Sequence, residues 1–185
     1  MPVWNATNVG HLLNRTLFGY SKNDLSVAQG YGTFSDLLDL AILKDNPAPI
    51  APNVWINTLP AASQTTSGET GLWYREFNYW WFNLMYKEGL NMREKMVLFL
   101  HNHFSNERDK VVYPQNMYTQ NVLFRKYAFG NFKQLVKEIS IDPSMLIYLD
   151  GNNSRGASPN ENYARELMEL FTMGIGNYTE TDIKQ

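Results

Sequence analysis

Two closely spaced histidines, His101 and His103, have side chains that could bind a metal ion or transfer a proton. They lie in a segment, 91–104, whose apolar spacing predicts a helix with one apolar face. His103 falls in the middle of that face, whereas His101 projects about 160° away on a helical wheel. An unbroken helix therefore cannot direct both imidazoles at one metal, and His103 is either a hydrogen-bonded core residue or a functional ligand.

Four charged residues on a second predicted helix, 160–173, could complete such a site. Arg165 lies four residues from both Glu161 and Glu169, so an intrahelical ladder of ion pairs would explain the acids without any function. The alternative is that a glutamate points inward with His103 and forms a carboxylate and imidazole cluster, which helical bundles use to bind iron, manganese or zinc. The candidate catalytic residues are His103, Glu166, Glu169 and Arg165, and the candidate metal ligands are His101, His103, Glu161 and Glu166.

No established motif supports this metal site. The spacing matches neither the Glu-x-x-His pairs of di-iron bundles nor the His-Glu-x-x-His helix of zinc proteases, and the sequence contains no Cys. The one cofactor that the residues suggest is a divalent metal of unpredicted identity. His11 and Arg15 could join the cavity of this candidate site, as a ligand or an anion clamp, or Arg15 could pair with a carboxylate across the core. The polar loop Asp150–Pro159 before Asn160 could hold an anion at a helix start, although a capped surface loop has the same composition.

The composition predicts a folded domain and excludes one class of partner. The 185 residues suffice for one domain with a proper core, and 44% of them are hydrophobic. Sixteen Lys and Arg against eighteen Asp and Glu leave a net charge of -2 without a basic run, so nucleic acid is not an expected partner. No apolar run reaches the ~20 residues that span a bilayer, and no signal peptide is visible, so no membrane span is expected.

Helical periodicity and capping signals recur along the chain and predict an all-α fold. We expect an irregular multi-helix bundle of about seven to nine helices, in a single domain that covers 1–185. Residues 45–71 contain four prolines and a Ser/Thr/Gly stretch, so they are expected to form a long surface loop. The predicted helices are 6–16, 21–29, 33–43, 72–88, 91–104, 114–129, 131–141 and 160–173, with one helical turn at 145–149.

The segment 72–88 carries large apolar side chains around almost its whole circumference. A helix that is apolar on all sides is usually buried, so this segment is predicted to be the central core helix of the bundle. The alternative is an aromatic platform that binds a sugar or another flat ligand. The side chains concerned are Trp73, Tyr74, Phe77, Tyr79, Trp80, Trp81, Phe82, Leu84, Met85 and Tyr86.

Five segments, in this order and at this spacing, carry a recognisable pattern: His11–Gly19, Met92–Phe104, Gly130–Phe132, Asp142–Asp150 and Pro159–Thr179. Together they resemble the bacterial family DUF1800. The resemblance implies a longer chain of which this is an N-terminal portion, an exported protein with a periplasmic or extracellular location, and a partner from a sulfatase-like family. It supplies no catalytic residues.

The last residues agree with that implication. Thr179 and Asp182 open a capping box, and the sequence stops within the first turn after it. A helix start without a body buries little surface, so the chain is expected to be a fragment.

Two functions remain open from the sequence. The first is a non-catalytic extracytoplasmic module that binds a partner protein or a glycan through its aromatic-rich surface or its long loop. The second is a metal-dependent hydrolase or oxidoreductase with His103 and the acids of 160–173 at its centre. The absence of a motif favours the first.

Overall fold

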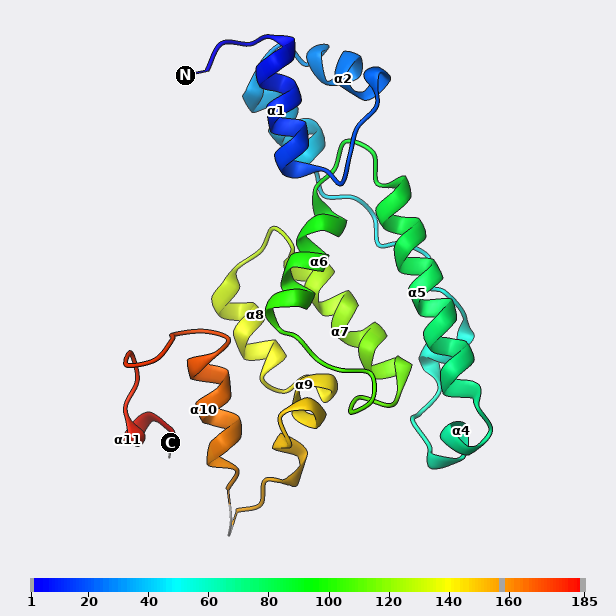
Figure 1. Ribbon diagram of the computed structural model, residues 1–185, viewed down its shortest axis with the longest axis vertical. Coiled ribbons are helices and arrows are strands. Elements are labelled where there is room, and N and C mark those ends of the chain that lie inside the picture. Colours follow the sequence, from blue (N-terminus) through cyan, green and yellow to red (C-terminus); the bar gives the residue numbers. More distant parts are fainter. Residues whose placement is uncertain (1, 157–158, 184–185) are drawn as a thin grey trace.

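The structure, a computed structural model, describes residues 2–156 and 159–183, and this part of the chain is helical without a strand (Figure 1). The all-α fold predicted from the sequence is confirmed. The α-helices are α1 (Ala6–Thr16), α2 (Lys22–Gln29), α3 (Phe34–Leu37), α4 (Ala62–Thr66), α5 (Glu69–Lys87), α6 (Arg93–His103), α7 (Pro114–Tyr127), α8 (Phe132–Ile139), α9 (Pro143–Tyr148), α10 (Glu161–Glu169) and α11 (Glu180–Ile183). The shorter turns are the π-helical η1 (Leu38–Ile42) and the 3-10 turns η2 (Val54–Asn57) and η3 (Gly151–Asn153).

Two clusters of buried apolar side chains hold these helices together. The smaller cluster lies among α1, α2, α3 and η1, at the top of Figure 1, and includes Leu13 and Ile42. The larger cluster joins α5 through α9 and the segment after α10. At its centre the Phe104 ring stacks on the rings of Phe124 and Phe171, at centroid distances of 6.0 and 5.9 Å.

The loop between α5 and α6 connects the two clusters. The buried Asn91 side chain donates hydrogen bonds to the carbonyl oxygens of Ala41 and Lys44, at 3.0 and 2.9 Å. The Lys95 ammonium donates to the carbonyl of Leu17, at 2.7 Å, just after the end of α1. These bonds satisfy backbone acceptors of the N-terminal helices and fix the two parts against each other.

The central helix of the larger cluster is α7. It packs against α5, α6, α8, α9 and η2 (Figure 1). Besides Phe124, its buried residues include the polar Gln115, Gln120, Asn121 and Arg125. Most of their polar atoms form hydrogen bonds within the protein, as buried polar groups generally do, whereas Gln115 Oε1 and Asn121 Nδ2 have no partner among the described residues.

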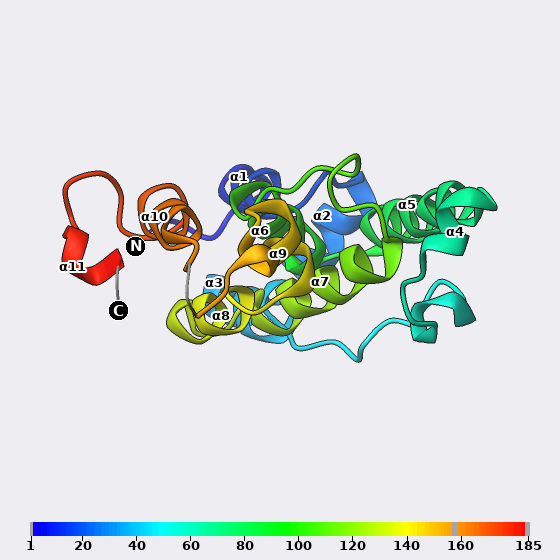
Figure 2. The same ribbon diagram turned by 90° about the horizontal axis from the view of Figure 1, so that it is seen from below.

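The predicted central position of 72–88 is wrong, because α5 lies at one edge of the molecule (Figure 2). Neighbouring helices cover a single face of α5, which buries Tyr74, Phe77 and Trp81. Trp73 and Trp80 are half-buried against the larger cluster, and the remaining rings face solvent. The most exposed rings are those of Tyr79 (70%), Phe82 (66%) and Tyr86 (89%).

The prediction that 45–71 forms one long surface loop is also wrong in part, because this segment contains η2 and α4. Trp55 of η2 is buried and stacks on Trp73 at a centroid distance of 5.7 Å. Its indole Nε1 donates a hydrogen bond to Glu76, at 2.7 Å. One large side chain thus anchors a polar segment to α5.

The short α11 begins with the predicted capping box. The backbone N–H of Thr179 donates to the Asp182 carboxylate at 2.8 Å, and the Asp182 N–H donates back to the Thr179 hydroxyl at 3.4 Å. Residues 184 and 185 of that predicted helix start lie outside the described residues. Among the described residues, no helix has the length and apolarity that crossing a membrane requires.

Candidate functional site

His103 is half-buried among phenylalanine rings and is held by one hydrogen bond. Its Nε2 donates to the carbonyl oxygen of Phe171 at 2.7 Å, since a carbonyl can only accept. Its ring meets those of Phe104 and Phe132 edge-on, at 4.7 and 6.1 Å. This contact ties α6 to the segment after α10.

His101 has different neighbours, as its position on the helical wheel predicts. Its ring packs edge-on against Trp81 at 5.2 Å and Phe124 at 6.3 Å. Burial lowers the pKa of His101, which favours the neutral imidazole. The two histidines therefore lie in separate surroundings.

The ion-pair ladder predicted within 160–173 does not form. Arg165 instead makes a bidentate pair with Glu180 of α11, at 2.8 and 2.9 Å. Glu169 accepts a hydrogen bond from the hydroxyl of Tyr178, and Glu161 is exposed in the first turn of α10. Arg165 and Glu169 thus bond to residues that follow α10 in the chain, and not to residues four positions away on the same helix.

Glu166 and His103 line separate cavities. Glu166 borders a polar cavity of about 570 Å³ together with Lys110 and Asp150, which pair with each other at 2.8 Å. His103 borders an apolar groove of about 350 Å³ that Phe99 also lines. Within 2–156 and 159–183, no group of three or more His, Asp and Glu side chains is close enough to hold a metal ion. The predicted His and Glu cluster is therefore not assembled by these residues.

The remaining candidates are also accounted for. His11 and Arg15 are exposed on α1, so the pairing of Arg15 across the core is wrong. Asn160 caps α10 by accepting the N–H of Tyr163 at 3.1 Å, and its amide donates to the carbonyl of Asp150 at 2.8 Å. Residues 157 and 158 of the predicted anion loop lie outside the described residues.

A buried ion pair that the sequence does not predict joins α6 to α7. Arg125 Nε and Nη2 donate to the two carboxylate oxygens of Glu94, at 2.9 and 2.6 Å, and both side chains are buried. The Trp81 indole donates to Glu94 at 3.1 Å, and Arg125 Nη1 donates to Asn121 at 2.7 Å. The guanidinium also lies 5.2 Å from the centre of the Trp80 ring. Both charges are thus hydrogen-bonded in the interior.

A second carboxyl group, that of Glu88, adjoins the pair at the N-terminus of α6. It accepts the backbone N–H of Glu94. Burial raises the pKa of Glu88 to about 7, and the negative charge of Glu94 contributes to the rise, while the backbone hydrogen bonds and Arg125 oppose it. Glu88 is therefore partly protonated at neutral pH.

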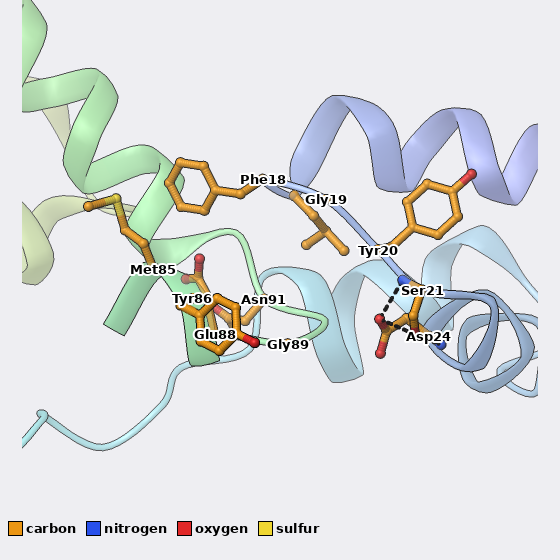
Figure 3. Close-up of a pocket in the computed structure, with 11 residues that line it drawn as sticks. Phe18, Gly19, Tyr20, Ser21, Asp24, Met85, Tyr86, Glu88, Gly89 and Asn91 are labelled. Atoms are coloured by element: carbon orange, nitrogen blue, oxygen red, sulfur yellow. Dashed lines mark hydrogen bonds between the residues drawn. The ribbon is translucent and has the colours of Figure 1, made fainter. Parts of the chain in front are cut away.

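Glu88 also borders a cavity of about 480 Å³ between the turn that follows α1 and the end of α5 (Figure 3). Phe18, Gly19 and Tyr20 form one side of it, opposite Met85 and Tyr86. Its lining thus offers the rings of Phe18 and Tyr86 and two carboxyl groups, and no Lys or Arg, while the hydroxyl end of Tyr20 lies against Gly10 of α1. The full lining is Leu17, Phe18, Gly19, Tyr20, Ser21, Asp24, Met85, Tyr86, Glu88, Gly89 and Asn91.

Local structure fixes both walls of this cavity. Ser21 caps α2 in a capping box with Asp24, whose carboxylate accepts the Ser21 N–H at 2.7 Å. That hydrogen bond lowers the pKa of Asp24, so this carboxylate is ionised at neutral pH. On the other wall the chain leaves α5 through Gly89, whose φ of 66° is a left-handed conformation that favours glycine.

The cavity has the properties of a small-molecule site. Its volume lies within the range of roughly 300–1,000 Å³ that is usual for ligand pockets. It combines apolar rings with a few polar groups, and such groups orient a ligand by hydrogen bonds. The arrangement supports recognition of a ligand that has both apolar faces and hydroxyl groups.

A comparison with models of protein families shows which family the chain belongs to. The model of the family described as "Protein of unknown function (DUF1800)" matches residues 11–185. The chain belongs to the DUF1800 family. The match to DUF1800 includes the larger core cluster, the smaller cluster except Val9 and its neighbour Trp4, and every residue of the cavity. No protein with a curated description and no solved structure matches the chain.

The buried pair leads to a first prediction for this DUF1800 chain. Replacing Glu94 with Ala leaves the Arg125 guanidinium buried without its counter-charge, so the free energy of unfolding should fall by about 3–5 kcal/mol. Replacing both residues with Met should recover most of that loss, because neither charge is then buried. Urea unfolding followed by circular dichroism measures both effects. Glu138→Ala, which breaks the exposed pair with Lys126, is the control and should change stability little. The prediction is contradicted if the double variant loses as much free energy of unfolding as the two single variants lose together.

Glu88 gives a prediction for pH dependence. Its pKa is about 7 in the folded chain and ordinarily 4.5, so the folded state binds more protons between these values. The stabilisation is therefore complete below pH 4.5 and is lost as the pH rises through 7. Glu88→Gln removes this titration and keeps the hydrogen-bond acceptor. Relative to wild type, the Tm of the variant should be higher at pH 8 than at pH 4 by roughly 2–6 °C, an effect reduced by the partial exposure of the carboxyl. Parallel Tm curves for the two proteins would show that burial does not perturb Glu88.

Proposed function

We propose that this DUF1800 chain is a non-catalytic binding module and that the cavity beside Glu88 binds a glycan. The observation that carries the proposal is the lining of the cavity, with the rings of Phe18 and Tyr86 and the carboxyl groups of Asp24 and Glu88.

The chemistry of a sugar ring matches this lining. One face of a pyranose carries C–H groups that pack against aromatic side chains, while its hydroxyls need hydrogen-bond partners at the ring edge. Tyr supplies both properties, because its ring is apolar and its hydroxyl is polar. Ionised Asp24 and partly protonated Glu88 add acceptors for those hydroxyls.

The geometry gives less support to the enzyme alternative. A metal-dependent mechanism would place His103 and a glutamate of 160–173 at one ion, whereas Glu166 lines a different cavity from His103, Glu169 bonds to Tyr178 and Glu161 is exposed. The sulfatase-like partner implied by the family resemblance stays a prediction, since no described contact bears on it.

Glycan binding is tested by removing one ring from the cavity. Phe18→Ala should weaken binding of the best ligand at least tenfold, equivalent to about 1.4 kcal/mol, because a stacking surface is lost. The probes are chito-, cello- and malto-oligosaccharides, screened by saturation-transfer NMR and followed by isothermal titration calorimetry.

The matched control is Phe132→Ala. Phe132 is 48% exposed against 46% for Phe18, and it lies outside the cavity. The control should bind the oligosaccharides as wild type does. The proposal fails if none of the oligosaccharides receives saturation from the protein, or if Phe18→Ala and the control bind equally.

We also propose that the parent protein acts outside the cytoplasm, in the periplasm or beyond it. The support is the resemblance to DUF1800 proteins with export features. Fusion of the parent protein to alkaline phosphatase, which is active after export, should give phosphatase activity in intact bacterial cells. Activity confined to a β-galactosidase fusion, which works in the cytoplasm, would contradict this location.

A further inference from the structure

The exposed face of α5 carries a regular seam of side chains. Leu72, Arg75, Tyr79, Phe82 and Tyr86 follow one another at spacings of three and four residues, and all five are exposed. This is the a and d pattern of a coiled-coil seam over two heptads, with Arg75 and Phe82 at d. Contiguous exposed apolar surface of this kind is uncommon on monomers and usually marks an interaction site.

Nothing within the described part of the chain packs on this seam. The helix forms one edge of the molecule, and α4, α6 and α7 contact it from elsewhere (Figures 1 and 2). The exposed Asn78 and Asn83 flank the seam on its two sides, so its border is polar. An apolar centre with a polar rim is the usual anatomy of a protein interface.

The single charge in the seam decides the direction in which two copies of α5 can pair. In a parallel pair of two α5 helices, Arg75 would face Arg75 of the other copy, and like charges in direct contact repel. In an antiparallel pair, a positions face d positions. Arg75 then lies over the ring of Tyr86 at each end, and Tyr79 faces Phe82 twice in the middle. Both ends gain a cation–π contact and the centre gains two aromatic pairs.

We propose that this face of α5 binds the same face of a second copy of the chain, in an antiparallel dimer. The contact runs from Arg75 to Tyr86, a length of about 17 Å at the helical rise. That seam is smaller than a standard interface, so the dimer is weak, with a Kd on the order of 10–100 µM.

Sedimentation velocity over a concentration series tests the dimer. Wild type should shift from monomer to dimer between about 5 and 500 µM, and Phe82→Ala should raise the Kd at least tenfold. Phe99→Ala is the matched control, because Phe99 is 59% exposed against 66% for Phe82 and lies on α6. Neither Phe82 nor Phe99 lines the cavity beside Glu88, whereas Tyr86 belongs to both the seam and the cavity, so the Phe82→Ala variant separates failure of the dimer from failure of glycan binding.

Cross-linking tests the direction, because the chain contains no Cys. A mixture of Arg75→Cys and Tyr86→Cys proteins should form a mixed disulfide, and the other end of that dimer keeps its native pair of Arg75 and Tyr86. Arg75→Cys alone should cross-link at least tenfold less. Monomer at every concentration would overturn the proposal, as would equal cross-linking of Arg75→Cys alone, or a Phe82→Ala variant that dimerises like wild type.

Discussion

The bidentate ion pair between Glu94 and Arg125 is the interaction on which the arrangement of the larger cluster depends. Removing two charges from water costs several kcal/mol for each ion, and the cost is recovered only when every donor and acceptor finds a partner. The fold meets this demand by placing the Trp81 indole on one carboxylate oxygen and the Asn121 amide on the guanidinium. Three helices, α5, α6 and α7, must therefore keep one mutual register.

That register extends to the junction between the two core clusters. Because α6 begins beside the pair, the chain that enters it carries Glu88 into a half-buried position where its carboxyl accepts the N–H of Glu94. In the same loop, the Asn91 amide donates hydrogen bonds to the backbone carbonyls of Ala41 and Lys44, where the N-terminal helices end. The cavity beside Glu88 thus arises where two separately packed clusters meet, which is a common place for a ligand site.

Aromatic residues divide between the interior and the surface in a way that periodicity does not reveal. The stack around Phe104 fills the larger cluster, whereas Tyr79 and Tyr86 face solvent on α5. Conversely, α7 carries polar side chains that are buried in the interior. Gln120 is fully buried there and donates to Asp142 at 3.0 Å, in a position that an apolar pattern would not mark as core.

The sequence by itself determined the all-α class, the boundaries of most helices within a few residues, the capping box that begins at Thr179, and the separation of the two histidines. These follow from interactions between residues a few positions apart. Only the tertiary structure decided that α7 is central, that Arg165 pairs with Glu180, and that Glu94 and Arg125 share one buried site. Those outcomes depend on contacts between distant segments, 31 residues apart for the buried pair, and helical spacing carries no information about them.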